Sequence, residues 1–509
     1  MSLLNVISFI GIFGLCAIAW LFSENRSPKY FPWRVVAIGI LLQLVLGFLV
    51  FAEPTIRTGL QGLSNILNVV FDAADAGARF IFGENLVPLA GQEPFLLSPA
   101  APNGACAADS AQVVPGFCGI QLGYVFAFRA LPAVVFFSGL MALLSSLGII
   151  QAITQIFAKI FYSILRLSGA ESLSGVVNIF VGVEAVIVVR QYLDKMTRSE
   201  LCAILACCFG TAASSTLVIY DGFLRPIFPN ILGHLVSASV MAIPACFVLS
   251  KILVPETIVP QTADGISDDR SQTDYEGNGS RETASREAIE RRQPMDTAIG
   301  GVLDGVRMAA TIAGVVILIL GLVYLINQFF GLLASLPSPI GDWFQILTLQ
   351  NILGALFLPL TVLTGISLEW NELWQSSVLI GRRLFETAIP PYQALGAAAV
   401  AGTLSSRAIV ITSYALSGFA HLAAFGIFVG GTLALVPSRR REIVGLGWKA
   451  LFVGTLATYM IACVAGVFDT GNPSILGTPA VAPAVTAPSP VRPVPAAPAI
   501  PASPASPVP

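Results

Sequence analysis

Long apolar runs recur along this chain, and they leave it few ways to fold. A helix needs about 20 apolar residues to cross the roughly 30 Å of hydrocarbon in a bilayer, and about eight runs of that length occur here. They lie near residues 3–22, 33–52, 125–147, 201–220, 231–253, 307–329, 405–436 and 444–468. With 55% hydrophobic and 11% charged residues among 509, the chain has too little polar surface for a soluble domain. The sequence therefore predicts an all-α polytopic membrane protein with about eight transmembrane helices.

Two further apolar stretches, residues 172–193 and 381–395, are too interrupted to cross a membrane, and each contains a glutamate. A carboxylate near the bilayer centre costs about 2.5 to 3.5 kcal/mol on insertion scales, so Glu184 and Glu386 are expected to face a protein interior or an aqueous path. We interpret both stretches as parts of re-entrant hairpins, the second within residues 346–395. Paired interrupted segments in the two halves of a membrane protein indicate transport.

Proline and glycine account for the two interruptions. In the second stretch, Pro390 and Pro391 forbid a continuous helix because they lack a backbone donor and clash with the preceding turn. In the first, the run NIFVG ends at Gly182, and a second short apolar run closes at Arg190. Non-helical backbone at membrane depth is tolerated only where protein or a water-filled cavity satisfies it. Both stretches are therefore expected to dip into the membrane and return.

Composition divides the chain into six parts. We expect N-terminal transmembrane helices (1–83), an outside loop (84–124), the first half of a transport core (125–256), a charged cytoplasmic linker (257–299), the second half of the core (300–468) and a Pro- and Ala-rich tail (469–509). The linker is too polar to bury a core, and the tail has the composition of a disordered, extended segment.

Charge and cysteine usage inform the topology. Arg26, Lys29 and Arg34 follow the first span, so they are expected in the cytoplasm and the N-terminus outside. Cys106 and Cys118 then lie in the outside loop, where oxidising conditions permit a disulfide. The other cysteines lie in apolar helices and are expected to be packing residues. The net charge of -2 is too small to indicate a nucleic-acid partner or a polybasic lipid-binding surface.

Oxygen-bearing groups cluster near the first interruption, where freed carbonyls and half-helix ends are able to coordinate small cations. They are Asn178, the carbonyls of Val181 and Val183, and the hydroxyls of Ser214, Ser215 and Thr216. Oxygen ligands suit a hard cation. Alternatively, each hydroxyl bonds back to a carbonyl of its own helix. The residues alone leave both interpretations open.

The ionisable groups near the interruptions also have alternative roles. Glu184 either contacts a solute or pairs with Arg190, and Glu386 either contacts a solute or pairs with Arg382 or Arg383, one turn away. His421 lies deep in the seventh span, where it is either a hydrogen-bonded packing residue or a proton site. Phe419, two positions earlier, is by default a core residue.

At these residues the chain resembles the concentrative nucleoside transporter family. The matching stretches are FRALPAVVFFSGLMALLSSLGIIQ (128–151), ESLSGVVNIFVG (171–182), RQYLDKMTRSEL (190–201), KILVPE (251–256), SSRAIVITSYALSGFA (405–420) and FGIFVGGTLALVPSRRR (425–441). The resemblance covers residues 125 to 468. It implies eight transmembrane helices with two re-entrant hairpins in an inverted repeat, assembled as a homotrimer, and cation-coupled uptake by movement of a substrate domain against a trimeric scaffold.

The resemblance also implies site residues. Asn178, Val181, Ser215 and Thr216 match the family's sodium-binding positions. Where the family reads G-Q-T-E-A-P in the first hairpin, this chain reads G-V-E-A-V from residue 182, so that Val183 and Glu184 follow the glycine. One residue is missing, and the base-contacting glutamine and the threonine that helps to hold the cation are absent.

The second hairpin and the seventh span depart from the family as well. The usual N-E-F-V-A-Y reads T-A-I-P-P-Y from residue 387, so that Ala388 stands where the family has its ribose-contacting glutamate, and Glu386 replaces it only through a shift of two residues. The usual G-F-A-N-F-S-S keeps Phe419 but has His421 in place of the asparagine and Ala424 in place of the last serine. A site that loses polar partners loses discrimination.

These observations predict a multi-pass protein of the cytoplasmic (inner) membrane, a symporter that takes up nucleosides with sodium by alternating access. The predicted substrate residues are Val183, Glu184, Glu386, Phe419 and His421, and the predicted sodium residues are Asn178, Val181, Ser215 and Thr216. No other cofactor is expected, and lipid is the surrounding partner. One alternative keeps the fold with another polar solute, or with protons and His421 as the coupling group. An intramembrane enzyme or receptor is the other, but no G-x-S-x-G or H-E-x-x-H pattern supports it.

Overall fold

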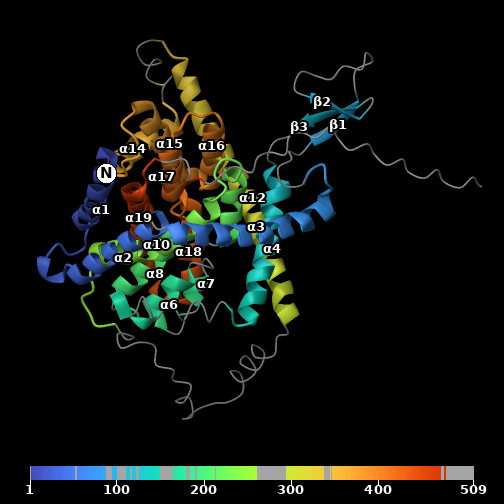
Figure 1. The fold of residues 1–509 in the computed structure, drawn as a ribbon. Coiled ribbons are helices and arrows are strands. Elements are labelled where there is room, and N and C mark those ends of the chain that lie inside the picture. The colour runs from blue at the N-terminus through green and yellow to red at the C-terminus, as the bar shows by residue number, and fades with distance from the viewer. Residues whose placement is uncertain are drawn as a thin grey trace, which may run out of the picture.

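The computed structural model is built almost entirely of helices (Figure 1). It describes residues 2–51, 54–87, 95–99, 110–114, 117–121, 125–149, 163–165, 167–178, 184–187, 189, 192–212, 214–260, 294–337, 344, 347–471 and 475–476. Most of the predicted linker and tail lie outside the described residues, and so does Cys106.

Among the described residues, six helices are long and apolar enough to cross a membrane. They are α1 (Leu3–Leu21), α2 (Trp33–Phe51), α4 (Phe126–Ser146), α10 (Ile231–Leu253), α12 (Pro294–Ala334) and α19 (Arg440–Phe468), the last preceded by the 3-10 turn η3 (Pro437–Arg439). A second 3-10 turn, η1 (Pro28–Tyr30), lies between α1 and α2. The prediction of a multi-pass helical membrane protein is confirmed.

Two of the predicted spans are not continuous helices. The run 201–220 is divided into α8 (Arg198–Gly210) and α9 (Ser214–Leu224), and the run 405–436 into α17 (Ser406–Leu416) and α18 (Leu422–Leu435). Apolar composition reports burial rather than helix continuity, and both interruptions are buried against other helices. The prediction of two uninterrupted spans here was therefore wrong.

The order of elements repeats in the two halves of the chain. The first half has the short helices α6 (Gly169–Val177) and α7 (Glu184–Ile187), then the divided helix α8–α9, then the long helix α10. The second half has α14 (Leu349–Leu363), α15 (Trp370–Glu386) and α16 (Ile389–Val400), then α17–α18, then α19. Each half thus presents a broken hairpin, a divided helix and a long helix in the same order.

The two long helices that end these halves form the centre of the molecule. In the most apolar window of both α10 and α19, 89% of the residues are buried, against 11% in α12. The cysteines of these central helices, Cys246 and Cys463, are buried, as predicted for packing residues. The centre is therefore the place where the hairpins and divided helices are held together.

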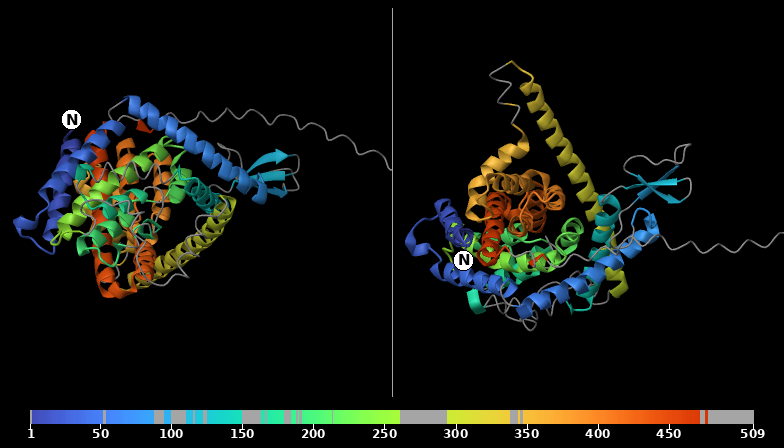
Figure 2. Two further views of the ribbon diagram at one scale, coloured as in Figure 1. Left: turned by 90° about the horizontal axis from the view of Figure 1, so that it is seen from below. Right: turned by 45° about the horizontal axis from the view of Figure 1, so that its top comes forward.

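Helices α12 and α4 lie side by side at the edge of the body in all views (Figures 1 and 2). Small residues permit this close approach: a Cβ added to Gly301 would lie 2.5 Å from the Cβ of Ala142, and one added to Gly305 would lie 2.8 Å from the Cβ of Ser138. Glycines four residues apart let helix backbones approach closely in membranes.

The region predicted as an outside loop contains a small sheet that the sequence analysis did not foresee. Helix α3 (Pro54–Phe82) leads to strands β1 (Phe95–Pro99), β2 (Ser110–Val114) and β3 (Phe117–Gln121). The order is β1-β3-β2, both pairs are antiparallel, and Phe95 pairs with Gln121. The sheet projects beyond the helices (Figure 2). Five-residue strands within a stretch rich in Pro, Ala and Gly give little signal in a sequence.

One end of the bundle gathers basic side chains. Arg198 lies 2.7 Å from the carboxylate of Glu24, and Lys449 contacts the same oxygen. Burial raises the pKa of Glu24, but the hydrogen bonds from Lys449 and Arg198 outweigh it and hold that pKa below its usual range. The backbone N–H of Glu24 also donates to the carbonyl of Leu253 at the end of α10. The positive-inside bias predicts that this end faces the cytoplasm.

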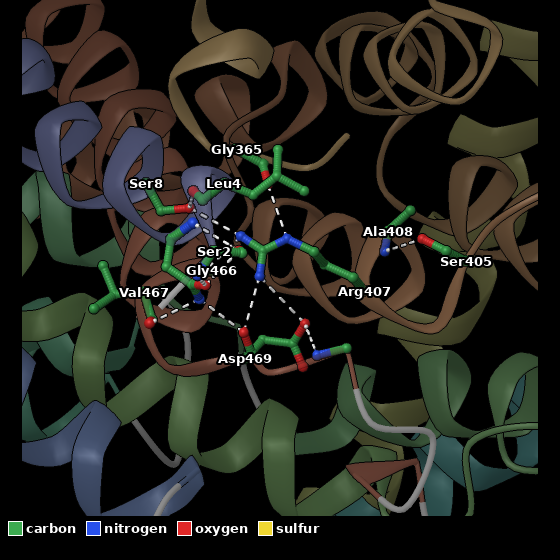
Figure 3. A network of polar contacts seen from close by, with 12 residues as sticks. Ser2, Leu4, Ser8, Gly365, Ser405, Arg407, Ala408, Gly466, Val467 and Asp469 are labelled. Carbon is green, nitrogen blue, oxygen red and sulfur yellow. Dashed lines mark hydrogen bonds and ion pairs between the residues drawn. The ribbon is translucent and has the colours of Figure 1, made fainter. Parts of the chain in front are cut away.

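A polar network closes the opposite end of the bundle, where α19 finishes (Figure 3). The Arg407 guanidinium donates to the carbonyls of Gly365 at 2.9 Å, Gly466 at 2.9 Å and Asp469 at 3.0 Å. The Asn5 amide donates to Gly466, Val467 and Asp469 carbonyls at 2.8 to 3.0 Å. The last carbonyls of a helix lack partners within it, and these donors from α1 and α17 supply them.

Candidate functional site

The two divided helices meet at their interruptions. The backbone N–H of Phe419, between α17 and α18, donates to the carbonyl of Thr211, between α8 and α9, at 3.2 Å. Gly418 makes this contact possible, because an added Cβ there would lie 2.7 Å from the carbonyl oxygen of Gly210. The two interruptions thus give each other a hydrogen-bond partner for one backbone group. Non-helical backbone at membrane depth requires such partners.

Asn178 lies beside this crossing, at the end of the first hairpin helix. It is the C-cap of α6 and only 1% exposed. Its amide nitrogen donates to the carbonyl of Ser174 at 3.0 Å, and its backbone carbonyl accepts from the Thr211 hydroxyl at 3.3 Å. Its side-chain oxygen Oδ1 is buried and has no hydrogen-bond partner among the residues that the structure describes. A buried oxygen left unpaired costs about 1 to 3 kcal/mol unless it is given a partner.

The other residues predicted to bind the cation are less completely described. Val181 and Val183 lie outside the described residues. Ser215 is described only in its backbone, in the first turn of α9, and Thr216 is buried in the same turn. The hydrogen bond to Asn178 from outside its own helix comes from Thr211, four positions before Ser215. Sequence reasoning missed Thr211 because the division of the helix at that residue was not predicted.

Glu184 begins the second short helix of the first hairpin. It is the first residue of α7, and its side chain lies outside the described atoms. The hairpin is fastened by the Ser174 hydroxyl, which donates to the carbonyl of Ala185 at 3.1 Å. Glu184 therefore directly precedes Ala185, whose carbonyl is hydrogen-bonded to α6, the helix that Asn178 caps.

The second hairpin turns at a strained residue. Thr387, between α15 and α16, has a φ of 67° and is the one non-glycine residue with positive φ among those described. A β-branched residue rarely adopts this conformation, and such strain is concentrated at functional sites. Pro390 and Pro391 follow within the first turn of α16, where a missing N–H costs nothing. The interruption that these prolines predicted is therefore present, just before them.

The ion-pair alternative for Glu386 is the one that the structure contains. Its Oε2 lies 2.8 Å from the Arg382 guanidinium, and its Oε1 accepts from the Gln350 amide at 3.1 Å. Gln350 in turn accepts from the Asn327 amide of α12 at 2.8 Å. Glu386 is 1% exposed, so this network anchors the second hairpin to α12. A contact between Glu386 and a solute would require it to leave these partners.

Both arms of the second hairpin bind the end of α17. Arg383 of α15 donates to the carbonyl of Ala415 and, at 3.0 Å, to the Thr458 hydroxyl. Tyr392 of α16 donates to the carbonyl of Ser413 at 2.5 Å. These carbonyls belong to the last turn of α17, where helix carbonyls lack partners. The hairpin thus completes the half-helix that leads into the crossing.

Arg383 is fully buried, at 1% exposed, and bonds only to these neutral oxygens among the described residues. A cation at a helix C-terminus is stabilised by the dipole of the helix. In the sequence, Arg383 was considered only as a partner of Glu386. Its real partners come from α17 and α19, and no local pattern indicates them.

Phe419 and His421 lie together in the interruption between α17 and α18. Their rings meet edge to face with centroids 6.0 Å apart. His421 is the N-cap of α18, and its Nδ1 accepts from the backbone N–H of Ala424 at 3.1 Å. A neutral imidazole that accepts at Nδ1 carries its proton on Nε2. Protonating His421 would therefore remove the cap of α18.

Comparisons with known proteins place the chain in a family. Models of the "Na+ dependent nucleoside transporter" family match the N-terminus at residues 10–85 and the C-terminus at residues 234–466, and a "nucleoside recognition" gate model matches residues 127–227. An uncharacterised transporter of Haemophilus influenzae is 31% identical over 92% of this chain and 98% of its own length. The putative nucleoside permease NupX of Escherichia coli is 29% identical over 91% and 98%.

A solved structure has the same fold. The transporter CNTnw in an outward-facing state superimposes with a TM-score of 0.73 at 32% identity, over 92% of this chain and 98% of that one. The interrupted helices described above therefore belong to the fold that this chain shares with CNTnw.

Proposed function

The chain belongs to the Na⁺-dependent nucleoside transporter family, and we propose that it imports nucleosides together with sodium ions across the cytoplasmic membrane. The observation that supports this most is the crossing of two interrupted helices, with the unpaired Oδ1 of Asn178 buried beside it. Half-helix ends at such a crossing bind ions and solutes in transporters with this kind of repeat. As a member of a transporter family, the protein is assigned no catalytic activity.

The donor atoms present fit a sodium ion. Asn178 would supply its side-chain oxygen, and Thr211 lies within hydrogen-bonding distance of the same residue. Val181, Ser215 and Thr216 complete the proposed set. The C-terminal ends of α6 and α8 add the partial negative charge of their last carbonyls. Bound sodium would supply positive charge at these helix ends. The role of the protein would be to hold α6 and α8 in the arrangement that binds the solute.

We propose that the solute lies between the hairpin tips and the α17–α18 interruption. Glu184 and Val183 would contact it from the first hairpin, and Phe419 and His421 from the interruption. Glu386 would join them only after leaving Arg382 and Gln350, so Glu184 is the principal carboxylate of the proposed site. The absence of the family's glutamine and ribose-contacting glutamate predicts weaker discrimination among nucleosides.

We further propose a homotrimer, an inverted relation between the two halves, and alternating access. The repeated order of hairpin, divided helix and long helix supports the relation between the halves. The exposed apolar side chains of α12, among them Ile317 and Phe329, supply a surface that a trimeric scaffold would cover. Chemical crosslinking and mass measurement of the purified protein will count the subunits.

Uptake into proteoliposomes tests this function. Labelled uridine and adenosine are expected to accumulate when an inward sodium gradient is imposed, and to enter slowly with potassium in its place. Dependence on pH without dependence on sodium would replace sodium with protons as the coupling ion. The structure favours sodium, because protonation of His421 would compete with its role as the cap of α18. No uptake of any nucleoside would overturn the substrate assignment.

Asn178 allows a sharper test of the ion site. Asn178→Ala removes the unpaired oxygen, and the sodium concentration that gives half-maximal uptake is expected to rise about tenfold, which corresponds to about 1.4 kcal/mol. Ser239→Ala is the matched control, because Ser239 of α10 is also buried with an unpaired oxygen but was not assigned to the site. If both variants keep the wild-type sodium dependence, Asn178 does not bind the ion.

A further inference from the structure

An apolar groove of about 630 Å³ lies between α1 and α2, far along the chain from the residues of the transport site. Its α1 side runs from Phe13 to Trp20, its α2 side runs from Trp33 to Leu44, and Phe31 of the connecting loop closes one end. From Trp33 to Leu44 the groove is about 16 Å long at 1.5 Å per residue. The hydrocarbon core is roughly 30 Å thick, so the groove has the depth of one leaflet.

Aromatic side chains mark the closed end of the groove. Trp33 is 68% exposed, Trp20 is 40% exposed, and the rings of Phe31 and Trp33 have centroids 4.4 Å apart. Exposed tryptophans concentrate at the level of the lipid headgroups, where an apolar ring with a polar N–H is best accommodated. The closed end therefore lies at the membrane surface, and the rest of the groove extends into the acyl region.

The loop and the first turn of α2 carry positive charge at this end. Arg26, Lys29 and Arg34 are exposed, and none of them forms an ion pair with a described residue. The nearby acid, Glu24, is already bound by Arg198 and Lys449. Lys29 and Arg34 directly follow the groove-lining residues Pro28 and Trp33 in the chain, and Arg26 lies two residues before Pro28. Three cations thus lie near the groove in the chain, without a negative partner among the described residues.

We propose that this groove is a binding site for one anionic phospholipid. An acyl chain would lie between α1 and α2, and the phosphate would lie among Arg26, Lys29 and Arg34. Basic pockets at the cytoplasmic ends of transmembrane helices bind anionic headgroups, and the positive-inside bias places this loop on that side. An anionic phospholipid has both the acyl chain that fits the groove and the net negative headgroup that complements three cations. A zwitterionic lipid lacks the net charge, and free phosphate lacks the chain.

Native mass spectrometry of the purified full-length protein tests the site with phosphatidylglycerol and phosphatidylcholine as probes. We expect one tightly retained phosphatidylglycerol per chain and no comparable phosphatidylcholine. The double variant Lys29→Gln, Arg34→Gln is expected to weaken phosphatidylglycerol binding about 30-fold. Arg440→Gln with Arg441→Gln is the control, because these exposed residues carry equal charge but, unlike Lys29 and Arg34, are not next to a groove-lining residue in the chain.

A second variant separates the groove from the charge. Ala37→Phe fills the groove and is expected to reduce retention as much as loss of the basic residues, whereas Val45→Phe, on α2 outside the groove, is expected to leave retention unchanged. Gel-filtration profiles confirm that each variant is folded. Equal retention of both lipids, binding that survives Ala37→Phe, or equal weakening in the control pair would each overturn the proposal. Soluble phosphate that displaces the lipid at low millimolar concentration would also overturn it.

Discussion

Replacement of Arg383 with methionine is expected to abolish most transport while leaving the protein folded. The guanidinium holds the last turn of α17 against the second hairpin through the Ala415 carbonyl, and it ties the hairpin to α19 through the Thr458 hydroxyl. A cation in a buried position at a helix C-terminus is worth up to about 2 kcal/mol, and loss of that amount from the transport cycle lowers uptake about 30-fold. The free energy of unfolding is expected to change less. The variant no longer has to desolvate a buried charge, and this gain offsets the cost of leaving the Ala415 carbonyl and the Thr458 hydroxyl without the guanidinium donor.

The measurement compares initial rates of nucleoside uptake with thermal unfolding in detergent. Tyr392→Phe removes only the other hydrogen bond from the hairpin to α17, and its loss of uptake is expected to be smaller, since a neutral hydrogen bond contributes about 1 kcal/mol. Arg383→Lys keeps the charge but not two separate donors and is expected to fall between wild type and methionine. Normal uptake by the Arg383→Met protein would show that Arg383 does not position α17. So would a large fall in its unfolding temperature, because the loss of uptake would then follow from unfolding.

Apolar runs were sufficient to predict a helical membrane protein, and the second interrupted run to predict a break in the helix; that the two interrupted segments are re-entrant stays a prediction. Pro390 and Pro391 locate the second break to within a few residues, because proline acts on the backbone locally. The break after Gly210 has no such local cause. There the backbone groups are satisfied by Phe419, which is distant in sequence, so a divided helix and a continuous one give the same apolar pattern.

The candidate site shows the same division between local and long-range signals. Asn178 was predicted as a sodium ligand and stays a prediction; its Oδ1 is buried with no hydrogen-bond partner among the described residues. Thr211 was missed because its contact with Asn178 exists only once α8 has ended. Glu386 was a candidate for the solute because a buried carboxylate is costly, but Arg382 and Gln350 already offset that cost. A sequence shows which groups need partners, and only the fold shows which partners they have.

The largest loss of stability is expected from Arg407, whose side chain joins the ends of three elements. It donates to carbonyls near the ends of α14 and α19, and to the Ser8 hydroxyl of α1 at 3.1 Å. Its guanidinium also lies 3.4 Å from the Asp469 carboxylate, which is 1% exposed. Breaking a buried ion pair by removing one partner costs about 3 to 5 kcal/mol. Arg407→Met is therefore expected to lower the unfolding temperature strongly, whereas Arg441→Met, at an exposed position, is not.

The pH dependence of this loss identifies its cause. Burial raises the pKa of Asp469, and Arg407 opposes that rise without cancelling it. Arg407→Met removes the positive charge that lowers the pKa of Asp469. In the folded variant the pKa of Asp469 is therefore higher than in the wild type. A group whose pKa is raised by folding contributes stability at low pH and loses it as the pH rises through the folded value. Unfolding temperatures of Arg407→Met and wild type are thus expected to differ least in mild acid and most above neutrality. A difference that does not change with pH would mean that the lost carbonyl contacts, rather than the buried charge of Asp469, destabilise the variant.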